Sequence, residues 1–148
     1  ACTVSGSVTV TVNALATVAP TATPAAICLG ASSTLAANAV AGSGVVSSYA
    51  WSAGLAGNVS GGAVSPAATT TYNVTVTNSN SCTATGSVVV TVNANPTVAP
   101  TAAPSTICNG QSTTLAANAT AGSGSILSYT WSGGLGNVSG GTVSPTSN

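Results

Sequence analysis

A spacing of 80 residues recurs along this chain, and it is the feature that most limits the folds the chain can adopt. Four residue pairs share it: Cys2 and Cys82, Asn13 and Asn93, Cys28 and Cys108, and Trp51 and Trp131. Residues 93–148 match residues 13–69 at most aligned positions, with one deletion near Gly136. A fixed period is the sequence signature of tandem structural modules. We therefore expect a last strand over 1–12, a complete module over 13–92, and a second module over 93–148.

A β-hairpin over residues 69–92 is the clearest local pattern. Apolar and polar residues alternate over 72–77, which is the period of a strand with one buried face. Residues 78–81 (NSNS) form a turn cluster, and valines recur at every second position of the return strand. The return strand has a near copy at the amino terminus, since CTVSGSVTVTV at 2–12 repeats CTATGSVVVTV at 82–92.

The rest of the complete module predicts short strands. Residues 13–27 form a proline-punctuated extended segment, and strands follow over 32–39, 45–52 and 63–65. Helical periodicity with caps is absent. Several short strands with a Trp in the third predict an all-β fold: tandem immunoglobulin-like Greek-key β-sandwich modules. We assign five aromatic side chains to the cores: Tyr49, Trp51, Tyr72, Tyr129 and Trp131. The glycine pairs Gly61-Gly62 and Gly140-Gly141 lack the context of a phosphate loop and predict turns.

The chain contains no Asp, Glu, Lys, Arg or His. It therefore offers no carboxylate or imidazole for acid–base catalysis, and no Ser or Cys nucleophile with a neighbouring base. Hard cations find no anionic ligand, and the cysteines lack the spacing of a zinc site, so we expect no metal. Together these absences lead us to expect that the chain is not an enzyme and binds no cofactor. The chain has no cationic side chain to bind the phosphates of nucleic acid, so we expect no nucleic-acid partner. It has no apolar run of about 18 residues, so we expect no segment that spans a membrane.

Several motifs together resemble a known family. They are I-C-x-G-x-S-x-T-L at 27–35 and 107–115, Y-x-W-S at 49–52 and 129–132, T-T-Y-x-V-T-V-T at 70–77 and C-T-A at 82–84. This pattern is similar to the tandem immunoglobulin-like or PKD-like repeats of long bacterial cell-surface adhesins. The resemblance implies an extracellular, cell-surface or secreted location. Such repeats serve as stalks and fibres as often as binding heads.

The four cysteines, Cys2, Cys28, Cys82 and Cys108, are disulfide candidates. In an immunoglobulin Greek key the turns at Cys28 and Cys82 lie at opposite poles, roughly 20 Å or more apart. A disulfide needs Cα atoms within about 7 Å. Disulfides across module junctions are therefore one interpretation, a Cys28–Cys82 bond in a different topology is a second, and free thiols are a third. Any disulfide implies an oxidising compartment.

The second module is expected to lack its last two strands, because its final residue aligns with Thr69. Such a module would have an unpaired edge and an open core. Either the chain is a window on a longer tandem protein, or another copy donates a strand by β-augmentation. The strand-donation candidates are the alternating valines Val4, Val8, Val10 and Val12. Donation is a heterologous contact, which propagates into a filament when it does not close.

These features predict a structural protein, a subunit of an extracellular bacterial fibre that binds other copies of itself. The alternative is the stalk or glycan-binding module of an adhesin, with surface glycans as partners. Glycosylation candidates are the N-x-[ST] triplets at Asn58, Asn73, Asn118 and Asn137.

The absence of charge predicts complete resistance to trypsin. An ordinary chain is about 25% charged, so chance would give this result with a probability on the order of 10^-18. Either selection removed the charges, or the written residues differ from those of the protein, with charged side chains recorded as Ala, Ser, Thr or Asn. Mass spectrometry after trypsin treatment should find the chain intact, whereas any tryptic peptide would establish the second explanation.

Overall fold

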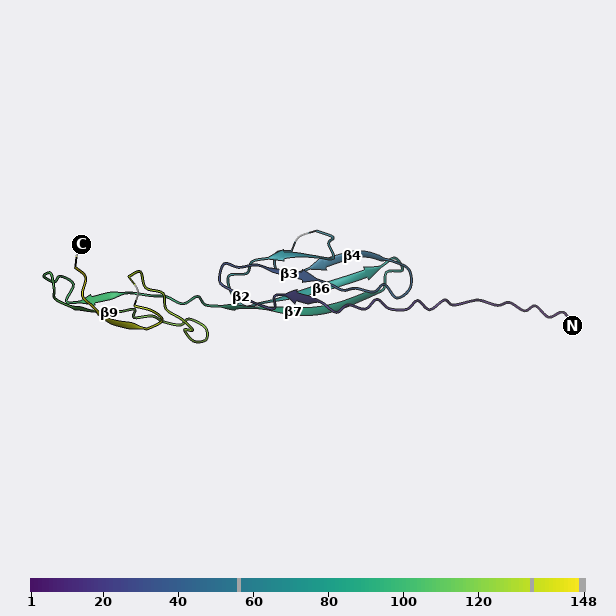
Figure 1. Cartoon of the computed structure of the whole chain (residues 1–148). Coiled ribbons are helices and arrows are strands. Elements are labelled where there is room, and N and C mark those ends of the chain that lie inside the picture. Colours follow the sequence, from purple (N-terminus) through teal and green to yellow (C-terminus); the bar gives the residue numbers. More distant parts are fainter. Residues whose placement is uncertain (56, 134, 147–148) are drawn as a thin grey trace. The chain divides into compact units, whose positions relative to one another are not determined.

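The computed structural model describes residues 1–55, 57–133 and 135–146, and these residues form strands and no helix (Figure 1). This confirms the expected all-β class. The chain divides at Val92 into two compact units, unit 1 (Ala1–Val92) and unit 2 (Asn93–Asn148). No helix among the described residues is long and apolar enough to cross a membrane.

Unit 1 contains two sheets. The first has the strand order β1-β3-β5, and the second has the order β2-β7-β6-β4. The bounds are β1 Thr21–Thr23, β2 Ala26–Cys28, β3 Ser33–Ala36, β4 Val46–Trp51, β5 Gly61–Val64, β6 Thr70–Asn78 and β7 Thr83–Asn93. The expected hairpin is present as β6 and β7, which pair antiparallel from Thr70↔Val90 to Thr77↔Thr83.

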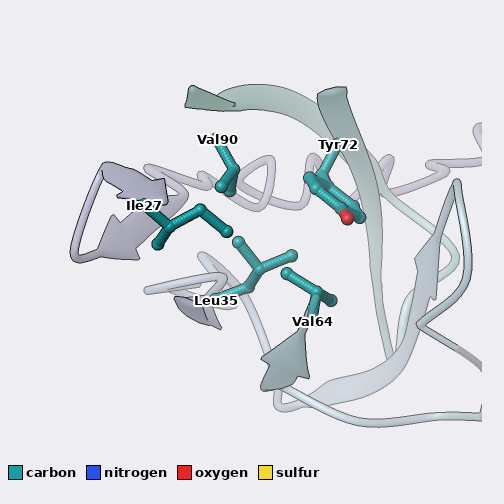
Figure 2. Packing of buried hydrophobic residues seen from close by; sticks show 5 residues of the cluster. All are labelled: Ile27, Leu35, Val64, Tyr72 and Val90. Carbon is teal, nitrogen blue, oxygen red and sulfur yellow. The ribbon is translucent and has the colours of Figure 1, made fainter. Parts of the chain in front are cut away.

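A cluster of apolar side chains joins the two sheets of unit 1 (Figure 2). Leu35 and Val64 come from the first sheet, and Ile27, Tyr72 and Val90 come from the second. All five are buried, and the most exposed of them, Val64, is 8% exposed. Burying a side chain of this size is worth about 1.5–3 kcal/mol, so this cluster is a major source of stability. Two sheets that face each other across such a core are compatible with a β-sandwich.

A second apolar cluster continues this core along β6. Val74 and Val76 are fully buried with Ala37, and half-buried side chains surround them. The surrounding side chains are Val18, Ala39, Val46, Tyr49 and Trp51. β6 therefore supplies the centre of the cluster, which follows from the Tyr-x-Val-x-Val alternation of its sequence.

The structure differs from the sequence-based expectations at the two glycine pairs and at the amino terminus. Gly61-Gly62 and Gly140-Gly141 were expected to be turns, but they open strands β5 and β10. A Cβ at Gly61 would collide with the backbone carbonyl of Leu35, so glycine is needed for close pairing of β5 with β3. Residues 1–12, expected to be a strand, have no strand assignment and are exposed throughout, because nothing pairs with them among the described residues.

Unit 2 contains one described sheet with the order β10-β9-β8. Its strands are β8 Thr101–Ala103, β9 Thr113–Ala116 and β10 Gly140–Val143. β8 and β9 pair with the same register, shifted by 80 residues, as β1 and β3, since Thr101↔Ala116 corresponds to Thr21↔Ala36. Residues 126–131, which align with β4, form no described strand.

Replacing the buried Asn78 with Ala should destabilise unit 1 by about 3 kcal/mol, because it leaves buried backbone groups without partners. The Asn78 Nδ2 donates to the carbonyls of Ala41 (2.8 Å) and Ser43 (3.0 Å), and its Oδ1 accepts from the backbone N–H of Asn80 (3.0 Å) and Cys82 (2.9 Å). Urea unfolding measures the change.

The matched control is Asn73→Ala on the exposed face of the same strand, expected within about 0.5 kcal/mol of the parent. Equal stability of the two variants would contradict the role assigned to Asn78.

Candidate assembly groove

No group of three or more His, Cys, Asp or Glu residues lies together in the described part of the chain. All four cysteines are free thiols: Cys2, Cys28 and Cys108 are exposed, and Cys82 is half-buried. Disulfides across module junctions stay a prediction, whereas the alternative Cys28–Cys82 bond conflicts with the strand register of unit 1.

The strand register separates Cys28 from Cys82 within unit 1. The backbone N–H of Thr91 donates to the carbonyl of Ala25 (2.9 Å), so β2 lies beside the carboxyl end of β7. Cys82 precedes Thr91 by nine residues of extended chain, about 30 Å, whereas Cys28 is within about 10 Å of Ala25. The two Cα atoms are therefore at least about 15 Å apart, beyond the reach of a disulfide of about 7 Å.

An apolar hollow of about 380 Å³ lies in unit 2, beside the sheet β8-β9-β10. We call it the unit 2 groove and define it by its apolar lining. The apolar lining consists of two prolines, Pro96 and Pro100, and of six further side chains: Val98, Ala117, Ala119, Ile126, Tyr129 and Trp131. Val98 is 65% exposed, so a large apolar side chain faces solvent at the groove.

The six side chains of the lining other than the prolines each have a counterpart in unit 1. The positions 80 residues earlier are those of Val18, Ala37, Ala39, Val46, Tyr49 and Trp51, the side chains that enclose Val74 and Val76. The unit 2 groove is therefore the space that β6 fills in unit 1. The structure describes no strand in that space.

The aromatic residues of the two units are held by matching hydrogen bonds. The Trp131 Nε1 donates to the carbonyl of Val138 (2.8 Å), as Trp51 Nε1 does to Val59 (3.0 Å). The backbone N–H of Tyr129 donates to Asn137 Oδ1 (2.6 Å). Tyr129 and Trp131 are half-buried, and the indole N–H is already bonded, so they present mainly apolar surface to the groove. Tyr72 is 3% exposed in the core of unit 1.

The strand-donation candidates lie at the opposite end of the chain and are fully accessible. Val4, Val8, Val10 and Val12 are 99%, 89%, 80% and 89% exposed. Their segment, residues 1–12, runs as an extended trace at the N end of Figure 1. Exposed alternating valines are a ready template for strand pairing.

The four glycosylation candidates differ in what their side-chain amides do. Asn58 Nδ2 donates to the carbonyl of Ser47 (3.1 Å), and Asn118 Nδ2 donates to the carbonyl of Ala99 (3.2 Å). Asn137 Oδ1 accepts the Tyr129 N–H described above. Asn73 lies exposed on β6. A glycan on Asn58 or Asn118 would disturb an existing hydrogen bond, whereas one on Asn73 would extend from the outer face.

Sequence reasoning missed Val98 and Ile126 as parts of a site. The signal was nevertheless present, because they align with Val18 and Val46 in the repeat. Only the observed packing around Val74 and Val76 shows that these positions face β6.

No protein-family model matches this chain, and no curated protein matches it significantly.

The groove predicts that Trp131 is more accessible than Trp51 in the monomer. Trp51 packs against both core clusters of unit 1, whereas Trp131 lies beside the unfilled space. In single-tryptophan variants at low protein concentration, acrylamide should quench the fluorescence of Trp131 more strongly than that of Trp51. Equal quenching would mean that another part of the chain covers Trp131.

Proposed function

We propose that this chain is a structural protein, a subunit of an extracellular bacterial fibre or filament assembled from head-to-tail immunoglobulin-like modules. The observation that carries the proposal is the combination of an exposed strand-like segment, residues 1–12, with a strand position in unit 2 that none of the described residues fills. Monomeric proteins rarely leave both features uncovered. Self-association would cover them together.

The order of the strands supports the immunoglobulin-like part of the proposal. The chain passes from β3 in the first sheet to β4 in the second, returns to β5, and then forms β6 and β7 in the second sheet. An immunoglobulin sandwich divides its strands in the same manner between a sheet with strands B and E and a sheet with strands C, F and G. The shared register and hydrogen bonds of the two units support the tandem repeat.

The chemistry of the side chains supports a structural role over an enzymatic one. The sequence contains no carboxylate or imidazole side chain and no Lys or Arg. Backbone hydrogen bonds and apolar contacts remain as the forces that can hold subunits together. The extracellular and bacterial parts of the proposal rest on the resemblance to adhesin repeats.

A second candidate function is the stalk or glycan-binding module of an adhesin. The presence of Tyr129 and Trp131 in a hollow favours it, since aromatic faces bind sugars. Their counterparts in unit 1 are core residues packed on β6, and this comparison favours a strand as the occupant.

Electron microscopy of the purified chain tests the filament proposal. Regular filaments with a repeat of one or two modules are expected. Single particles or separate beaded strings at high protein concentration would favour the adhesin stalk.

The concentration at which filaments form should be nearly independent of salt and of pH between about 4 and 7. No Asp, Glu, His, Lys or Arg is present to be screened or titrated. Sedimentation at low and high salt and across this pH range measures the effect. A several-fold change in the critical concentration would show that ionic groups contribute to assembly.

A further inference from the structure

We propose that the unit 2 groove binds the segment Thr3–Val12 of a second copy as a strand that pairs antiparallel with residues 126–131, in the position that β6 occupies in unit 1. This inference rests on the proposed function and names the contact that would build the filament. Each side of the contact is described in the structure, and unit 1 supplies the template for joining them.

The sequence of the segment fits the centre of this position. Val8-Thr9-Val10-Thr11 is identical to Val74-Thr75-Val76-Thr77 of β6. In β6 these two valines are fully buried between the sheets. A strand presents alternate residues to one face, so Val8 and Val10 can enter the groove together.

Unit 1 also fixes the expected register. There, Trp51 lies opposite Val74 and Tyr49 lies opposite Val76 in the β4–β6 pair. The corresponding pairs in the complex are Trp131 with Val8 and Tyr129 with Val10. Aromatic side chains opposite β-branched residues are favourable cross-strand pairs.

The β6 position is favoured over the β7 position, although residues 2–13 differ from residues 82–93 at only three places. β7 pairs with β6 along most of its length and otherwise only with β2, which has three residues. A single strand in the β7 position of unit 2 would therefore leave a gap in the sheet. In the β6 position, the same strand pairs directly with residues 126–131.

The donor segment is free to reach another molecule without unfolding unit 1. All of residues 1–13 are exposed. The first tie to unit 1 in this region is at Ala14, whose backbone N–H donates to Ser43 Oγ (2.8 Å) and whose carbonyl accepts from the Ser43 N–H (3.2 Å). Because donor and groove differ, the contact is heterologous and can repeat from copy to copy.

Two double variants of the full chain test the contact. Val8→Asp with Val10→Asp places carboxylates on the face that would enter the groove, and should weaken self-association about 100-fold or more, because buried unpaired charges are costly. The matched control, Ser7→Asp with Thr9→Asp, places the same charge on the outward face and should change self-association by about threefold at most. Sedimentation velocity measures the self-association of both variants. Because residues 7–10 are exposed in the monomer, circular dichroism should show both variants folded.

The outcomes separate this proposal from the proposed function. Filaments that form equally well from both variants would overturn strand donation and leave the filament intact. A closed dimer that is sensitive only to the valine substitutions would support donation and overturn the filament. A wild-type chain that stays monomeric at high concentration would overturn donation.

Cysteine cross-linking tests the position of the strand. In a background with the four native cysteines replaced by Ser, Thr9→Cys with Thr130→Cys joins residues that correspond to the pair Thr75↔Ala50. Directly opposed residues are about 4.5–5.5 Å apart, within disulfide range, so oxidation should give intermolecular ladders. The pair Thr11→Cys with Ser105→Cys tests the β7 position, because these residues correspond to Thr91 and Ala25, which are hydrogen-bonded in unit 1. Ladders from this pair alone would overturn the β6 placement.

Discussion

The packing of the buried side chains of β6 in the core of unit 1 is the interaction on which the rest of the structure depends. Val74 and Val76 are fully buried, and Tyr72 extends the same face into the neighbouring cluster. β6 also pairs with a strand on each side, β4 and β7. One strand thus supplies the centre of the core and the centre of the four-stranded sheet.

In unit 2 the residues that correspond to the core of unit 1 are present, but no described strand takes the place of β6. Its core residues are therefore less buried. Leu115, Ile107 and Val143 are half-buried, whereas their counterparts Leu35, Ile27 and Val64 are buried. Residues 126–131 form no described strand, since a β4 counterpart needs a β6 counterpart to pair with. The groove is therefore the position of β6 in the repeat, which the described residues of unit 2 leave unfilled.

Much of unit 1 could be predicted from the sequence, because its strongest pattern is local. The alternation over 72–77 and the NSNS turn predicted β6, β7 and their connection. Strand bounds elsewhere were less accurate, since short strands such as β1 and β2 depend on partners far along the chain. The glycine pairs were predicted wrongly because the need for glycine in β5 and β10 comes from close approach to Leu35 and Leu115, which the local sequence does not show.

The sequence predicted the donor segment of the candidate site but not the residues that line the groove. The exposed valines were identified from their alternation, and the expected open core was identified from the repeat. The lining of the groove required the observed packing around β6. The absence of charge then limits the means of recognition: without ionic pairs, the fit of valines to a hollow and the register of backbone hydrogen bonds must select the partner.

A filament reconstruction that resolves the strand beside residues 126–131 would test the central claim most directly. The account predicts a strand in the β6 position of unit 2 whose chain leads to Ala14 of a neighbouring subunit. A groove filled by a strand of the same chain, or a groove left empty in the assembled filament, would contradict it.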